Sequence, residues 1–144
     1  MKEKKQSKEW YIAATHWLTA GLAMPFLLTL ILGIPAALVI GKDNIALLTV
    51  VMSAIWILSL WLGVMYSAKY LAKTYIIKNS DNIIRLAAIY LAVLGGGFRL
   101  IGLSKGITLA SMIDLGFFVV GVAVFYILSK KYVKNTDDAI VPQQ

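Results

Sequence analysis

The 144-residue chain contains no cysteine and only one histidine, His16. Without cysteine there is no disulfide, no thiolate metal site and no cysteine nucleophile. A single histidine also excludes a haem held by two histidines of one chain, and a histidine-rich metal site. We therefore expect no metal and no cofactor, and we interpret His16 as an interfacial residue at the cytoplasmic edge of the first hydrophobic run.

Charged residues are scarce: they make up 15% of the chain, whereas hydrophobic residues make up 60%. A soluble domain carries about 25% charged and about 45–50% apolar residues. The apolar residues are also grouped in long runs, and about 20 such residues are enough for a helix to cross a bilayer. The sequence therefore predicts an all-α integral membrane protein. It forms a single domain over residues 1–134, with a four-helix transmembrane bundle at about 17–40, 45–66, 83–103 and 107–128.

Positive charges are distributed unevenly between the two ends of these predicted helices. Two of the fourteen Lys and Arg residues, Lys42 and Lys105, lie in very short loops, and Arg99 lies within a run. The other eleven lie at the opposite ends: Lys2, Lys4, Lys5, Lys8, Lys69, Lys73, Lys78, Arg85, Lys130, Lys131 and Lys134.

Cationic residues in short flanking segments stay in the cytoplasm, so the side with eleven is the inner side. We predict two helical hairpins in the plasma membrane, with both termini cytoplasmic and anionic lipids at the cytoplasmic face. The polar tail, residues 135–144, is predicted to be disordered. Because topology accounts for the net charge of +7, we expect no nucleic-acid partner.

Arg99 and Asp114 are the charged residues inside the third and fourth predicted helices, apart from Arg85 where the third begins. A charge facing lipid costs about 2.5–3.5 kcal/mol near the bilayer centre. Side chains lean toward the N-terminus of their helix, so on antiparallel helices these two lean toward each other. We predict an intramembrane ion pair, which is either a structural clamp or a substrate or proton site. In the alternative, Arg99 snorkels to the outer surface.

Small residues form a stripe along the third predicted helix. Ala88, Ala92 and Gly96 recur every four residues, and Gly95 and Gly97 flank the last of them. Such stripes let helices approach closely in lipid. We predict helix packing at these five positions, within the chain or in a dimer. In the alternative, the glycines unwind locally and offer backbone groups to a ligand.

Two prolines, Pro25 and Pro35, lie in the first hydrophobic run. A proline lacks the backbone N–H, and its ring clashes with the carbonyl four residues earlier. We therefore expect a kink near Pro25, which is a candidate hinge, and a bend at the outer end of the helix near Pro35.

The sequence contains no recognisable catalytic arrangement: no paired carboxylates within the membrane, no nucleophile with an evident base and no metal cluster. We favour an accessory or assembly subunit of a membrane complex, working as a homo-oligomer or with a larger membrane protein. The alternative is a minimal transporter or channel that works as an oligomer, with Arg99 and Asp114 as its polar lining. A membrane enzyme acting on lipid is the third reading, and the scarcity of buried polar groups disfavours it.

Overall fold

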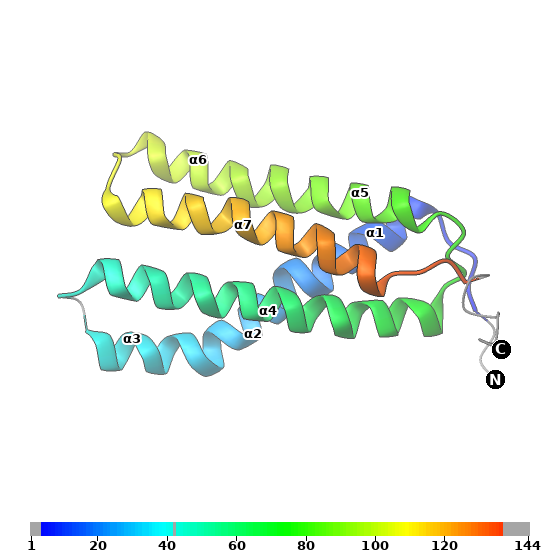
Figure 1. Ribbon diagram of the computed structural model, residues 1–144, viewed down its shortest axis with the longest axis horizontal. Coiled ribbons are helices and arrows are strands. Elements are labelled where there is room, and N and C mark those ends of the chain that lie inside the picture. The colour runs from blue at the N-terminus through cyan, green and yellow to red at the C-terminus, as the bar shows by residue number, and fades with distance from the viewer. Residues whose placement is uncertain (1–3, 42, 137–144) are drawn as a thin grey trace.

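The computed structural model describes residues 4–41 and 43–136, and this part of the chain is helical and contains no β-strand. Helices extend without a break over Glu9–Ile40, Ile45–Thr74, Ser80–Ser104 and Leu109–Tyr132, and each is long and apolar enough to cross a membrane (Figure 1). The predicted all-α class and the four apolar helices are confirmed. The first helix begins about two turns earlier than predicted, and the second continues about two turns further.

The first helix is interrupted twice by π-helical turns. It consists of α1 (Glu9–Trp17), η1 (Leu18–Ala23), α2 (Met24–Leu28), η2 (Thr29–Gly33) and α3 (Ile34–Ile40). Pro25 follows η1 and Pro35 follows η2, so the carbonyls that the two rings would meet, those of Gly21 and Ile31, lie in the π-helical turns. A π-helical turn replaces the regular hydrogen bonds between residues four apart. It does so here at the positions where proline, which has no backbone N–H, cannot form such a bond. The hinge at Pro25 stays a prediction.

The remaining helices begin at side-chain caps. Asn44 accepts a hydrogen bond from the backbone N–H of Leu47 at the start of α4 (Ile45–Thr74). Asn79 caps α5 (Ser80–Tyr90), which continues through η3 (Leu91–Gly95) into α6 (Gly96–Ser104), and Thr108 caps α7 (Leu109–Tyr132). These caps satisfy N–H groups that have no partner within the helix.

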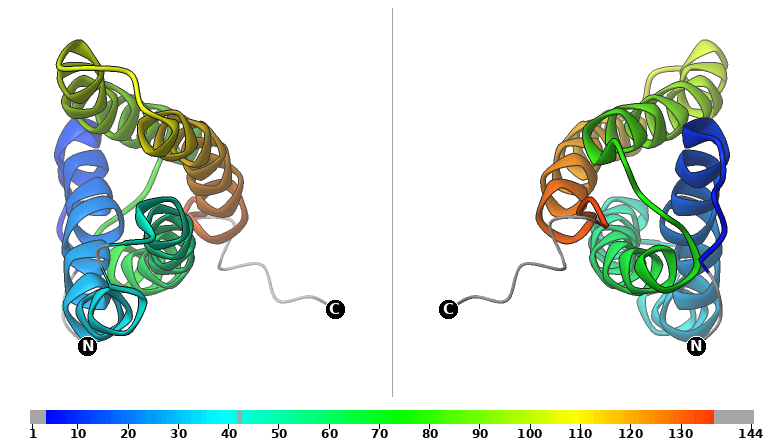
Figure 2. Two further views of the ribbon diagram at one scale, coloured as in Figure 1. Left: turned by 90° about the vertical axis from the view of Figure 1, so that its left-hand side faces the viewer. Right: turned by 90° about the vertical axis from the view of Figure 1, so that its right-hand side faces the viewer.

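Helices from different halves of the chain pack together most extensively. The largest set of contacts joins α4 to α7, α1 lies on α5, and η1 and α2 cross α4 (Figures 1 and 2). The first predicted hairpin is thus packed internally, where η1 and α2 cross α4, and it also packs against the second through the α4–α7 and α1–α5 contacts. The connections α3–α4 and α6–α7 lie together at one end of the molecule, which we call the open end.

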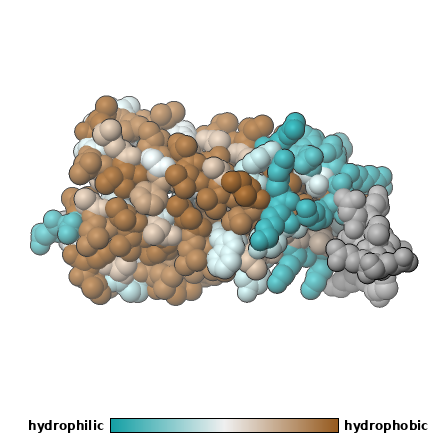
Figure 3. Space-filling view, in the orientation of Figure 1, coloured by the Kyte–Doolittle hydropathy of each residue, from teal (hydrophilic) through white to brown (hydrophobic). Residues whose placement is uncertain are grey.

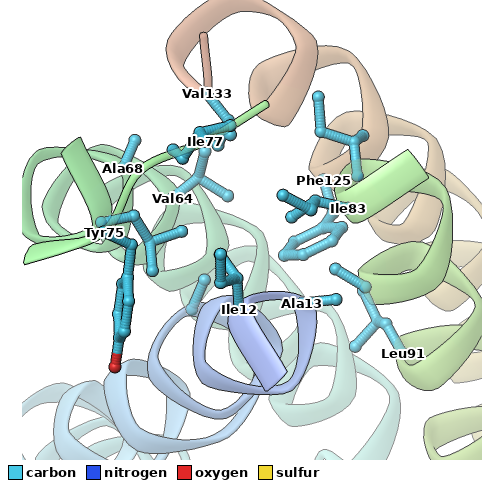
Figure 4. Close-up of a cluster of buried hydrophobic side chains, with 14 of the residues drawn as sticks. Ile12, Ala13, Val64, Ala68, Tyr75, Ile77, Ile83, Leu91, Phe125 and Val133 are labelled. Carbon is cyan, nitrogen blue, oxygen red and sulfur yellow. The ribbon is translucent and has the colours of Figure 1, made fainter. Parts of the chain in front are cut away.

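The buried core lies toward the other end, which we call the sealed end. Buried side chains from α1, α4, α5 and α7 meet there, among them Ile12, Val64, Ile83 and Phe125 (Figure 4). By contrast, α3 and α6 contain no buried residue. In this view the surface is mostly apolar over the middle of the molecule and the open end, except for a small polar tip at the open end, and polar side chains gather around the sealed end (Figure 3).

Both ends of the described chain are tied to the α4–α5 connection at the sealed end. The backbone N–H of Thr136 donates to Ile77 O at 2.8 Å, and the side chain of Asn135 accepts from the N–H of Ser80 at 2.8 Å. On the other side, the N–H of Lys5 donates to the last turn of α4. Asn135 and Thr136, which we placed in a disordered tail, thus satisfy backbone groups of this connection. The rest of that tail lies outside the described residues.

Candidate functional site

Arg99 on α6 and Asp114 on α7 meet near the open end. The Nε atom of Arg99 lies 2.9 Å from Oδ2 of Asp114, and its Nη2 donates to Oδ1 at 3.3 Å. Nη1 donates to the carbonyl of Gly95 at 3.3 Å, whereas the buried Nε–H has no aligned acceptor among the described residues. The structure thus brings together the two charges that the sequence pairs. The Arg99 side chain is 24% exposed and that of Asp114 40%, so the carboxylate remains accessible.

Two aromatic rings hold the guanidinium in place. The Cζ atom of Arg99 lies 4.3 Å from the centroid of the Phe118 ring and 5.2 Å from that of Trp56. Trp56 itself packs directly on α7 at Gly121. Only a glycine leaves room for the ring there, since a β-carbon at this position would lie 2.0 Å from it. Cations are attracted to aromatic faces at these distances. Arg99 is therefore held by groups from α4, α6 and α7, and it does not extend to the surface as in the snorkelling alternative.

A cavity of about 430 Å³ lies beside the ion pair. Its walls come from the first half of α4, from α6 and from the start of α7: Leu48, Thr49, Met52, Ser53, Trp56, Arg99, Ala110 and Asp114. The lining combines one cation, one anion, two hydroxyl groups and an aromatic ring with aliphatic side chains. Such a mixture of apolar walls and a few convergent polar groups is typical of a binding site for a small molecule.

The glycines below Arg99 differ in what they contact. A β-carbon at Gly95 would lie 2.8 Å from Cε2 of Phe118, and one at Gly96 would lie 3.4 Å from Cε1. A β-carbon at Gly97 would meet nothing within 4 Å. Gly95 and Gly96 therefore make room for the Phe118 ring that contacts Arg99, whereas Gly97 faces open space. The backbone around Gly95 is π-helical and continuous, so the local unwinding that we considered is not seen.

The other small residues of the stripe are half-buried, and Ala88 packs against the hydrophobic core. Ala88 and Ala92 line a shallow apolar groove beside α7. Among the glycines, the one whose β-carbon would meet the backbone of another helical segment is Gly63 on α4, where it would lie 2.8 Å from Cα of Ala20 in η1. Sequence reasoning missed this contact, although Ser59, Gly63 and Ser67 recur every four residues on α4 and form a small-residue repeat of their own.

His16 forms a second polar site, at the sealed end. Its side chain is fully buried; Nδ1 lies 2.6 Å from Oγ of Ser67 on α4, and Nε2 lies 2.8 Å from Oγ of Ser129 on α7. The imidazole also packs on Phe125, with ring centroids 5.3 Å apart. The interfacial position predicted for His16 is wrong, because α1 begins at Glu9 and carries the side chain between two facing helices.

The Ser67–His16–Ser129 cluster ties three helices together. A neutral imidazole has one N–H donor and one acceptor nitrogen, so it can satisfy a hydroxyl on each side. The hydrogen-bond distances match those of a nucleophile and its base. However, all three side chains are fully buried, so a substrate cannot reach either hydroxyl. The cluster therefore acts as a buried polar tie between α1, α4 and α7.

Comparisons of the chain with family models, with curated proteins and with solved structures give no match. Among the described residues, no three His, Cys, Asp or Glu side chains lie close enough together to hold a metal ion. Function must therefore be argued from the two polar sites and from the contrast between the open and the sealed end.

Proposed function

We propose that this chain is an accessory or assembly subunit of a membrane complex, inserted with its sealed end in the cytoplasm. The sealed end supports this role, since side chains from α1, α4, α5 and α7 fill the space between the helices there. The buried His16 tie closes the same region. Within the described part of the chain, buried side chains thus fill the space between the helices at the sealed end, where a solute path along the axis of one protomer would have to run.

The proposal rests on the open end, where exposed apolar side chains lie beside a cavity and a partly exposed ion pair. Large apolar side chains of α3 and α6 face outward there, with Val39 87% and Phe98 77% exposed. In lipid, exposed apolar surface alone does not drive association, which depends on close packing and polar contacts. The open end offers both, because it combines a cavity with a partly exposed ion pair. A transmembrane helix of a partner protein packed against α6 and α7 would cover these groups.

Photo-crosslinking in native membranes tests this proposal. A crosslinking amino acid at Phe98 on α6 should capture one specific larger membrane protein, which should also copurify with the chain in mild detergent. The matched control is Ile127, which is also exposed but lies near the sealed end of α7. Equal capture from both positions, or lipid adducts only, would contradict a partner at the open end.

A second candidate function, a minimal transporter or channel, is favoured by the cavity beside Arg99 and Asp114. Since the sealed end is closed in a single protomer, a solute path would have to lie between protomers. A clean homo-oligomer with no larger partner, together with loss of transport in a folded Asp114→Asn variant, would support this function over the first.

The proposed orientation can be tested with single cysteines, because the natural chain has none. Asp43→Cys and Lys105→Cys lie at the open end, and Lys78→Cys and Lys134→Cys lie at the sealed end. A membrane-impermeant maleimide should label the first two in intact cells and the last two only after permeabilisation, because cationic flanks stay inside. The cysteine-free parent gives the background. Labelling of the sealed-end cysteines in intact cells would reverse the orientation.

A further inference from the structure

We propose that the cavity beside Arg99 and Asp114 binds a zwitterionic group, in which an ammonium and a phosphate or carboxylate are joined by a few atoms. The phosphate or carboxylate meets Arg99, and the ammonium meets Asp114. This inference goes beyond the accessory role and is independent of it, because it concerns what the cavity holds whether or not a partner covers it.

The charge balance of the lining selects for zwitterions. Arg99 and Asp114 are the only charged residues among those that line the cavity, so its net charge is zero. A net charge inside an apolar site is costly because it has lost its water and has no counter-charge. A ligand with only an anion or only a cation would bring such a net charge. A zwitterion aligned antiparallel to the ion pair keeps the site neutral and places each of its charges beside an opposite one.

The two protein charges have bonding capacity left for a ligand. A guanidinium carries five N–H donors, and Nη1 and Nη2 of Arg99 each make one hydrogen bond within the described chain. The Nε–H lies beside the carboxylate without being aligned on it. A carboxylate can accept at about four lone-pair positions, and that of Asp114 is the more exposed partner. Both groups can therefore bind a ligand without first separating.

The rest of the lining suits the ammonium and the short aliphatic link of such a ligand. The Thr49 hydroxyl donates to the carbonyl of Ile45 at 2.9 Å, which leaves its oxygen lone pairs as acceptors toward the cavity. Ser53 adds a second hydroxyl. The aliphatic side chains that complete the wall suit methylene groups. A volume of about 430 Å³ is in the range of small-molecule sites.

Two sources could supply this chemistry: the headgroup of an ethanolamine phospholipid, or a free zwitterion such as an amino acid. Calorimetric titration of the purified full-length chain separates zwitterions from their parts. The probes are glycerophosphoethanolamine and glycine. The controls carry charge of one sign: glycerol 3-phosphate is only negative, and ethanolamine is only positive. We expect at least one zwitterion to bind about tenfold or more tightly than either control, as expected for one extra charge-assisted hydrogen bond. For the lipid, the chain is placed in nanodiscs with and without phosphatidylethanolamine. Binding of the headgroup would appear as a higher melting temperature of the protein in the nanodiscs that contain this lipid.

Charge variants make the proposal falsifiable. Asp114→Asn leaves the cavity cationic, so its preference should move to glycerol 3-phosphate, and Arg99→Gln should move the preference to ethanolamine. A destabilised protein cannot produce such opposite changes in preference. Arg85→Gln removes a cation outside the cavity and should change nothing. Stabilisation by the lipid alone assigns the site to a headgroup, and binding of glycine assigns it to a free zwitterion.

Two results would overturn the inference, and both are available from the wild type if a variant fails to fold. One is equal affinity for glycerol 3-phosphate and for the zwitterions. The other is the absence of any response to the soluble zwitterions and to phosphatidylethanolamine alike. Neither result bears on whether a partner helix is captured at Phe98, so the two proposals fail separately.

Discussion

Replacing His16 by alanine lowers the free energy of unfolding by about 2–4 kcal/mol, more than we expect from removing either member of the Arg99–Asp114 pair. Two costs add up. The hydroxyls of Ser67 and Ser129 lose their shared partner, and the space of the imidazole beside Phe125 is left empty. Either hydroxyl can turn to a carbonyl of its own helix, which keeps the loss below the sum of two unpaired groups.

The measurement is denaturant or thermal unfolding in a mild detergent, with helical content as the signal. Ser67→Ala and Ser129→Ala should each cost less than His16→Ala, because each leaves one ring nitrogen bonded. Thr15→Ala is the matched control one residue away; the Thr15 hydroxyl donates to the Tyr11 carbonyl of its own helix and lies within reach of the Tyr75 hydroxyl, so we expect a loss of no more than about 1 kcal/mol. Equal stability of the His16→Ala and Thr15→Ala proteins would show that the polar tie does not hold the sealed end together.

The number of helices could be predicted from the sequence because a bilayer imposes a minimum length on apolar runs. Their ends were less predictable. The α1 helix continues back to Glu9 and α4 forward to Thr74, through polar and aromatic segments that resemble membrane flanks. At these extensions the helices pack against one another at the sealed end, where Ile12 and Leu71 are fully buried. Tertiary packing of this kind decides a helix end that local composition leaves open.

The partners of the helices could not be predicted, because α4 and α7 are apolar on every side and therefore give no amphipathic signal. The close contact at Gly121 is invisible for the same reason, since any small residue in such a helix could be the one that meets a neighbour. Gly63 is different, because it lies in the four-residue repeat of Ser59, Gly63 and Ser67. His16 was misplaced because its two serine partners are distant in sequence. A usable signal existed on α4, where Ser67 shares one helical face with other residues that prove to be buried: Leu60, Val64 and Leu71.

Arg99 and Asp114 were easier to pair because charged residues in a membrane helix have few alternatives. Each must face protein, water or a counter-charge, and these two lie on consecutive helices joined by a short turn. The cavity beside them depends on how α4 approaches α6 and α7, which the sequence does not indicate. The ion pair could thus be predicted, whereas the site it borders could not.

Removing either member of this pair should cost about 2 kcal/mol. A deeply buried charge left without its partner typically costs about 3–5 kcal/mol, but both side chains are partly exposed, and polar contacts in membranes are weaker because other partners exist. Asp114→Asn leaves the guanidinium on the faces of Trp56 and Phe118 without a counter-charge. Arg99→Gln leaves the carboxylate beside an apolar wall. We therefore expect both single variants to unfold more readily than the wild type.

The double variant should lose less stability than the two single losses combined, by about 1 kcal/mol, because neither charge is left alone. A second cycle on Asp81→Asn and Lys105→Gln provides the control: these residues lie at opposite ends of the Ser80–Ser104 helix, too far apart to interact, so their effects should add. Additive losses for Arg99 and Asp114 as well would mean that the two charges do not depend on each other in solution.

If they are coupled and the double variant keeps its cellular role, the pair is a clamp between α6 and α7. If they are coupled and the folded double variant no longer binds zwitterions and has lost that role, the same two residues form a binding site, because stability alone no longer explains their effect.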